Sequence, residues 1–180
     1  MSLDELTTLA VAASWAAVVG TIVLMYWQTR QAQKLNSGNA VIALREQFDK
    51  ADMRRSRRRL AHGLLSNDPN APVPFDIARF FELIGYLTHR GILEDTLVWD
   101  AFGGWVTSYY ICMRSPVDRI GNARNEFRDH LIFGEFEWLH GRMVELDSQR
   151  LGGPIPSTEE LVQDGRMMLG HESKMDDLSD

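Results

Sequence analysis

The sequence predicts an all-α protein with one N-terminal transmembrane helix followed by a small cytoplasmic helical bundle. Three observations predict this: a long uncharged apolar run near the N-terminus, apolar side chains at helical spacing further along, and no convincing period-two alternation. A chain of 180 residues, 44% hydrophobic and 24% charged, has the length and composition of one ordinary domain. These values exclude a collagen-like or wholly disordered chain.

The apolar run contains no charged residue between Leu6 and Thr29. A helix from Leu6 to Trp27 is about 33 Å long, which is enough to cross a hydrocarbon core of about 30 Å. Tyr26 and Trp27 stand at one end, where amphipathic rings prefer the headgroup level. A cleaved signal peptide would begin with basic residues and have a shorter apolar core. We therefore predict a transmembrane helix.

The charge of the chain is arranged in blocks. Residues 1–29 carry a net charge of -2, residues 30–66 carry +6, and residues 67–150 and 151–180 carry -5 each. Because basic segments stay on the cytoplasmic side, the sequence predicts an inner-membrane protein with its N-terminus outside and its C-terminal domain in the cytoplasm. The predicted regions are a short extracytoplasmic end over 1–5, a transmembrane helix over 6–29, a basic juxtamembrane helical region over 30–66, a cytoplasmic helical domain over 67–150 and an acidic, mostly disordered tail over 151–180.

Helices follow one another through the cytoplasmic domain. The first carries its apolar face at helical spacing and stops at Gly91, and the second runs from Thr96 to Arg114. Ser115 is expected to cap a third helix, whose apolar face is predicted to include Ile120, Ala123, Phe127 and Leu131. A last helix is expected over 134–149. In the tail, residues 157–160 resemble the start of one short helix.

Self-association is predicted from two features. The helix from Thr96 to Arg114 is apolar nearly all round, so it must be buried in the domain or against another subunit. The transmembrane run carries small residues every fourth position, which lets two helix backbones approach closely. We therefore expect a homo-oligomer, and the predicted oligomerisation residues are Ala12, Ala16, Gly20, Trp99, Trp105 and Tyr109.

A basic patch lies in the juxtamembrane region, and two interpretations remain open. The patch consists of Arg54, Arg55, Arg57, Arg58 and Arg59. It is either a contact for anionic lipid or RNA, or a solvated helix face that pairs with the acidic body. The second is favoured, because charge runs are usually solvated faces and lipid contact would require the chain to fold back.

The stretch FFELIGYLTHRGIL followed by WDAFGGWVTSYY resembles the bacterial family known as domain of unknown function 4760. The matching residues are Phe80, Phe81, Glu82, Gly85, Gly91, Phe102 and Trp105. The resemblance extends over roughly Leu6 to Arg150 and implies a small anchored helical protein with no established activity. The layout is also similar to that of membrane-anchored accessory proteins of RNA-targeting CRISPR systems.

Candidate catalytic residues are few. Arg124 and His130 resemble the arginine and histidine of HEPN-type ribonucleases, in which the arginine would stabilise a phosphate and the histidine would act in acid–base chemistry. The same segment also fits an ordinary helix, because Glu126 and His130 form an i,i+4 pair. With Cys112 as the single cysteine and only one Glu-x-x-His step, we expect no metal site and no cofactor.

The sequence therefore favours a single-pass inner-membrane protein that acts by self-association or partner binding through its helical domain. The layout resemblance suggests a role in phage defence or stress. The alternatives are a membrane-tethered HEPN-like ribonuclease, which would bind RNA, and a scaffold subunit of a larger membrane complex. No small-molecule site is evident from the sequence.

Overall fold

The computed structural model describes residues 24, 25, 27, 28, 31, 32, 35–66, 74–152, 154 and 156–174. The chain divides into two compact units, Met1–Ser37 and Gly38–Asp180. Within the described part of the first unit the residues are helical, and the side chains of Leu24, Met25 and Trp27 are more than half exposed. Most of the predicted transmembrane segment, with Ala12, Ala16 and Gly20, lies outside the described residues. Among the residues that the structure describes, no helix combines the length and the apolar character that crossing a bilayer requires.

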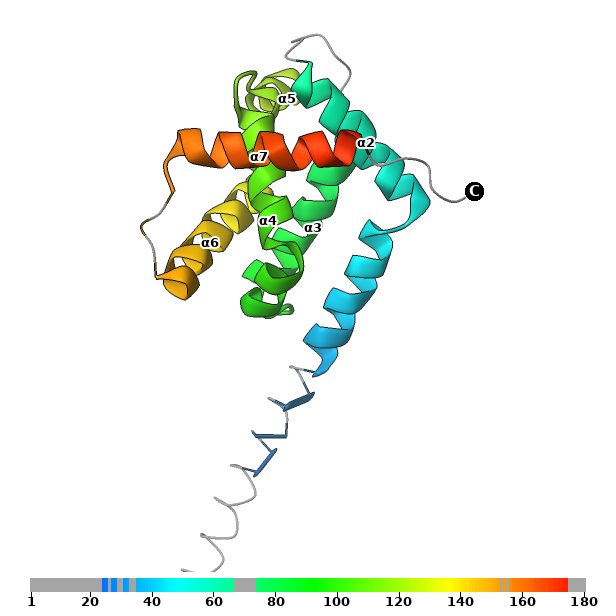
Figure 1. Ribbon diagram of the computed structural model, residues 1–180. Coiled ribbons are helices and arrows are strands. Elements are labelled where there is room, and N and C mark those ends of the chain that lie inside the picture. The colour runs from blue at the N-terminus through cyan, green and yellow to red at the C-terminus, as the bar shows by residue number, and fades with distance from the viewer. Residues whose placement is uncertain are drawn as a thin grey trace, which may run out of the picture. The chain divides into compact units, whose positions relative to one another are not determined.

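The second unit is built from helices, and its described residues contain no strand, which confirms the all-α prediction. Residues 38–48 are helical. They precede α2 (Ala51–Leu65), α3 (Asp76–His89), α4 (Asp95–Arg114), α5 (Arg119–Phe127), α6 (Gly134–Leu151) and α7 (Thr158–Ser173). Helix α4 is central, since it packs against α3, α5, α6 and α7, and Figure 1 shows α7 lying across it.

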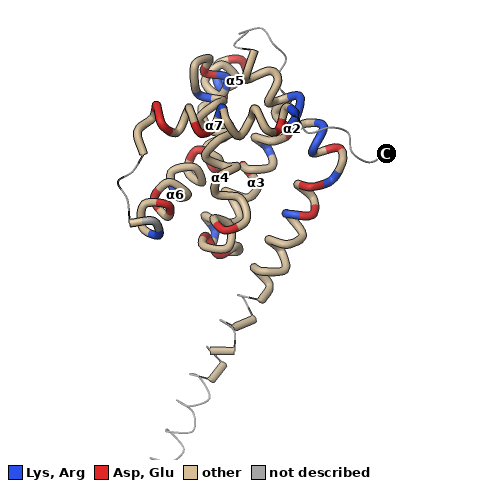
Figure 2. Tube along the Cα trace, viewed as in Figure 1, with Lys and Arg blue, Asp and Glu red and all other residues tan. Residues whose placement is uncertain are grey.

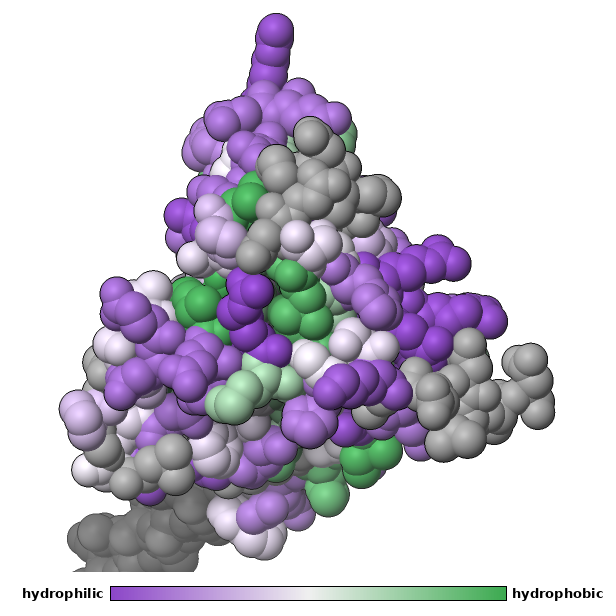
Figure 3. All heavy atoms as spheres, turned by 45° about the horizontal axis from the view of Figure 1, so that its top comes forward, coloured by the Kyte–Doolittle hydropathy of each residue, from purple (hydrophilic) through white to green (hydrophobic). Residues whose placement is uncertain are grey.

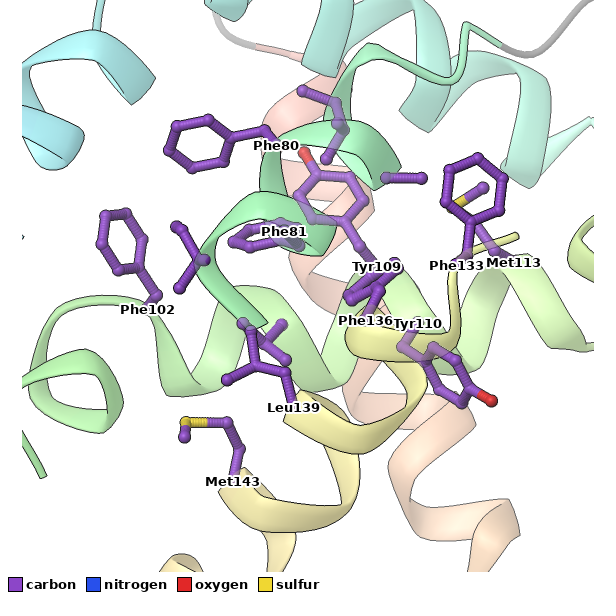
Figure 4. Packing of buried hydrophobic residues seen from close by; sticks show 14 of the residues in the cluster. Phe80, Phe81, Phe102, Tyr109, Tyr110, Met113, Phe133, Phe136, Leu139 and Met143 are labelled. Atoms are coloured by element: carbon purple, nitrogen blue, oxygen red, sulfur yellow. The ribbon is translucent and has the colours of Figure 1, made fainter. Parts of the chain in front are cut away.

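An aromatic cluster forms the middle of the core. The ring centroids of Phe48 and Phe80 are 5.3 Å apart, and Phe81 lies 5.6 Å from Phe48 and 5.4 Å from Phe136. Figure 4 shows Phe81 and Phe136 among the side chains that α3, α4 and α6 contribute. Because Phe48 and Leu60 are fully buried here, residues 38–65 belong to the same compact unit as the rest of the domain. The structure thus places the start of this compact unit at Gly38, ahead of the domain start expected at residue 67.

Two residues of the family-like motif explain how α3 and α6 pack. Glu82 accepts a hydrogen bond from the backbone N–H of Phe136 at 2.7 Å, which satisfies a free donor in the first turn of α6. Gly85 lies directly against the same turn, since a Cβ atom there would be 2.2 Å from the carbonyl oxygen of Glu135. Any larger residue at position 85 would push the two helices apart.

Helix α5 begins later and ends earlier than predicted. Ser115 follows α4 as its C-terminal cap, and the N-cap of α5 is Asp118, whose side chain accepts from the backbone N–H of Gly121 at 2.7 Å. The helix ends at Phe127, so Phe127 and Leu131 are exposed and do not continue its apolar face. The longer carboxylate at Asp118 provides the cap that Ser115 was expected to provide.

The acidic tail contains a full helix, which corrects the prediction of a mostly disordered segment. Ser157 and Glu160 form a capping box that starts α7, as their spacing indicated. Leu169 is 1% exposed, while Glu159, Glu160 and Asp164 face solvent. Three of the four acidic residues of α7 lie on its outer face, while its inner face, which includes Glu172, packs on α2 and α4.

A histidine of α6 is half-buried against α4. The ring of His140 stacks on Tyr110 with centroids 4.4 Å apart. Burial lowers the pKa of His140 from its ordinary 6.5 to about 4, although the Glu137 carboxylate acts in the opposite direction. The folded domain therefore holds this imidazole in its neutral form at neutral pH.

We predict that His140 makes the domain sensitive to mild acid. Between pH 6.5 and pH 4 the unfolded chain binds a proton at His140 that the folded chain does not, so stability falls as the pH falls. From pH 7 to pH 5 this group costs about 1–2 kcal/mol. Urea unfolding followed by circular dichroism in mild detergent should show a smaller loss for His140→Gln than for the wild type. Equal losses in the two proteins would contradict this account.

Candidate functional site

The least ordinary feature of the core is the side chain of Arg57, which α2 places inside the domain. It is 2% exposed. Its guanidinium carbon lies 4.2 Å from the ring centroid of Phe48 and 5.1 Å from that of Trp105. A cation above aromatic faces is attracted by the ring electrons, and the attraction grows when water is excluded. Arg57 thus joins α2 to the aromatic surface of α4.

The counter-charge comes from the other end of the chain. Glu172 of α7 is also 2% exposed, and its Oε2 lies 3.4 Å from Nε of Arg57. Burial raises the pKa of Glu172, and the guanidinium of Arg57 opposes that shift. A second carboxylate, Asp49, lies at the rim with its Oδ1 3.9 Å from Nη1 of Arg57. The buried pair therefore links α2 to α7.

The phenol of Tyr109, from α4, completes this buried cluster. Burial, together with the nearby Glu172 carboxylate, raises the pKa of Tyr109. Among the described residues, no well-aligned hydrogen-bond partner is found for Nε of Arg57, the hydroxyl of Tyr109 or Oε1 of Glu172. Buried polar atoms are normally paired, so three loosely paired atoms at one point require an explanation. Arg57, Tyr109 and Glu172 are called the charged core cluster below.

The structure separates the five arginines of the predicted basic patch into surface residues and one core residue. Arg54, Arg55 and Arg59 are exposed and Arg58 is half-buried, whereas Arg57 points into the core. Figure 2 shows the basic residues along α2. Arg57 stands three residues before Leu60 and seven before Leu64, so its position on the apolar face was readable from the helical spacing. Within the patch, Arg57 therefore pairs with two carboxylates, Glu172 of α7 and Asp49 just before α2.

The predicted oligomerisation residues of α4 are used within the chain. Tyr109 is fully buried, and Trp105 stacks on it with centroids 6.1 Å apart. The Nε1 of Trp99 donates to Oδ1 of Asp147 at 2.6 Å, and Arg150 lies 4.4 Å above its ring. Helices α6 and α7 pack on α4 within the described chain, and a role of these residues in oligomerisation stays a prediction.

The side chain of Arg124 makes two hydrogen bonds within the chain. Its Nε donates to the carbonyl oxygen of Ile132 at 2.9 Å, and its Nη2 donates to Glu137 at 2.7 Å. The hydrogen bond from Arg124 lowers the pKa of Glu137, with a smaller contribution from Tyr110. His130 lies beyond the end of α5, in an exposed turn. Arg124 thus fastens the α5–α6 connection to α6, and a catalytic role for this pair stays a prediction.

A surface groove lies between the end of α2 and the first half of α7. Its volume is about 690 Å³. Hydrophobic lining comes from Leu65, Val162 and Met167, and Glu159 and Arg166 contribute charged groups. Figure 3, which turns the top of Figure 1 forward, shows hydrophobic side chains set among hydrophilic ones on that face. Such a lining suits an amphipathic partner.

Comparison with known proteins identifies one family. The family described as Domain of unknown function (DUF4760) matches residues 7–143. Comparison with curated proteins and with solved structures finds no match. The match covers most of the chain and includes the motif residues Glu82 and Gly85, whose packing roles are described above. The chain therefore belongs to the DUF4760 family.

Proposed function

We propose that this protein is a single-pass inner-membrane protein that acts by self-association or partner binding through its helical domain. Membrane anchoring is inferred from the uncharged run from Leu6 to Thr29, which is followed by the basic segment over 30–66. Exposure of Leu24, Met25 and Trp27 supports it, because apolar side chains that face outward suit a lipid environment. The helical domain would then lie in the cytoplasm.

Binding is proposed because the described surface offers apolar contact area. The groove beside α7 has a hydrophobic lining, and the large side chains of Phe127 and Leu131 are 59% and 68% exposed. Exposed apolar groups of this size are typical of surfaces that meet another protein. A role in defence or stress rests only on the similarity of layout noted from the sequence, and a scaffold role in a larger membrane complex remains the alternative within this class.

The anchor is tested by placing a charge in the middle of the run. Val18→Arg should move most of the protein out of carbonate-washed membranes, because an arginine at the bilayer centre costs about 2.5–3.5 kcal/mol or more. Ile42→Arg, at an exposed position of the helical domain, is the matched control and should remain in the membrane. A reporter fused after Asp180 should be active in the cytoplasm, and periplasmic activity would refute the proposed orientation.

Self-association is tested in mild detergent by light scattering. The wild type should give a mass above that of one protomer at micromolar concentration. Gly20→Leu should lower that mass, because a large side chain separates helices that pack through Ala12, Ala16 and Gly20. Ala10→Leu, away from this stripe, should have little effect. A protomer mass for the wild type would disprove self-association.

The ribonuclease alternative is tested at Arg124 and His130. With Arg124 in its structural role, Arg124→Ala should lower the free energy of unfolding by about 1 kcal/mol, whereas His130→Ala should change it by less than about 0.5 kcal/mol. Incubation of the purified protein with single-stranded RNA provides the second measurement. If the wild type cleaves the RNA and His130→Ala abolishes cleavage while keeping its fold, the ribonuclease alternative replaces the binding proposal.

A further inference from the structure

Helix α7 lies outside the part of the chain that matches the family, yet it covers the centre of the matched part. The match ends at residue 143, and α7 spans Thr158–Ser173. Its main contacts are with α2 and α4, both of which lie inside the match. The surface that buries Arg57 thus lies within the family match, and the helix that covers it lies C-terminal to the match.

The contact follows a simple helical pattern. The buried residues of α7 are Gly165, Leu169 and Glu172, at spacings of four and three, so they form one stripe along the helix. A Cβ atom at Gly165 would lie 2.8 Å from Sγ of Cys112, which shows how closely α7 approaches α4 there. Leu169 adds the apolar contact, and Glu172 reaches Arg57. Anchors at i, i+4 and i+7 are typical of a helix bound in a groove.

We propose that the surface of α2 and α4 around Arg57 is a helix-binding site, which α7 occupies within its own chain and which α7 of a second copy can occupy in its place. This proposal rests on the proposed self-association and names the contact for it. The occupant is a second copy because each copy carries the complementary helix. Exchange would form the same contacts between chains that exist within one chain.

The connection to α6 suits such an exchange. Helix α6 ends at Leu151, its C-cap Gly152 has a φ of +66°, and the following residues up to Ser157 include Gly153, Pro154 and Pro156. Glycine and proline end the helix and keep this short connection from joining α6 and α7 into one helix. Since α7 packs mainly on α2 and α4, its position is determined by that surface more than by the helix that precedes it.

The energetics of the charged core cluster favour a specific but exchangeable contact. Leu169 is the one apolar side chain of α7 that is almost fully buried in the described structure, and Leu161, Val162 and Met168 pack against the core while partly exposed. A buried ion pair adds little net stability, yet removing one partner leaves an unpaired buried charge and is strongly unfavourable. Any helix that replaces α7 must therefore bring a carboxylate to Arg57. The loosely paired polar atoms of the cluster agree with a contact that can open.

The native cysteine allows a direct test with the full-length protein. Chains of two sizes are coexpressed: the wild type, which has Cys112, and a tagged chain with Gly165→Cys and Cys112→Ser. Oxidation of isolated membranes with copper phenanthroline should give a linked heterodimer on a non-reducing gel, because position 165 of one chain would face Cys112 of the other. Asp164→Cys with Cys112→Ser, one residue away on the exposed face, is the control and should give none.

A second measurement covers the case in which Gly165→Cys prevents docking. A labelled peptide of residues 156–174 should bind the full-length wild type in mild detergent, and Glu172→Ala in the peptide should weaken binding by at least about tenfold. Glu159→Ala, at an exposed position, should leave binding unchanged. Absence of both the heterodimer and peptide binding overturns the helix-binding site. If light scattering still shows an oligomer, the proposed self-association survives through another contact; if it shows a protomer, both proposals fail.

Discussion

The burial of Arg57 is the constraint on which the arrangement of this domain depends. An arginine inside a small helical domain needs a carboxylate and a water-free aromatic surface, and three separate parts of the chain supply them. Phe48 and Trp105 provide the rings, and Glu172 brings the charge from the C-terminal helix. Helix α7, which carries Glu172, therefore lies where α2 and α4 bring Arg57 and Trp105 together.

The family motif also acts through packing. Phe80 and Phe81 fill the core, Glu82 satisfies a backbone donor of α6, and Gly85 allows the two helices to touch. None of these four residues belongs to the charged core cluster. The segment by which the family is identified therefore builds the α3–α6 pair. The distinctive chemistry of the domain adjoins it where α2 and α7 meet α4, since the ring of Phe81 lies 6.2 Å from that of Tyr109.

Local patterns predicted the helices with continuous apolar faces, and long-range partners decided the rest. The α3 and α4 segments were readable because their apolar residues recur at helical spacing. The start of α5 was misplaced because Ser115 and Asp118 both resemble caps, and only the hydrogen bond to Gly121 distinguishes them. Helix α7 was mistaken for a disordered tail because its stabilising partners, Arg57 and the surface of α4, lie far away in the sequence. Arg57 was grouped with its exposed neighbours although its spacing from Leu60 and Leu64 places it on the apolar face of α2.

The close approach of Gly165 to Cys112 has a consequence for the chemistry of the single cysteine. Burial raises the pKa of the Cys112 thiol to about 11, so at neutral pH almost none of it is the reactive thiolate. The covering helix is also what keeps water-soluble reagents from the sulfur atom. Alkylation of Cys112 would then require α7 to leave its site, so its rate would report how often the helix is displaced.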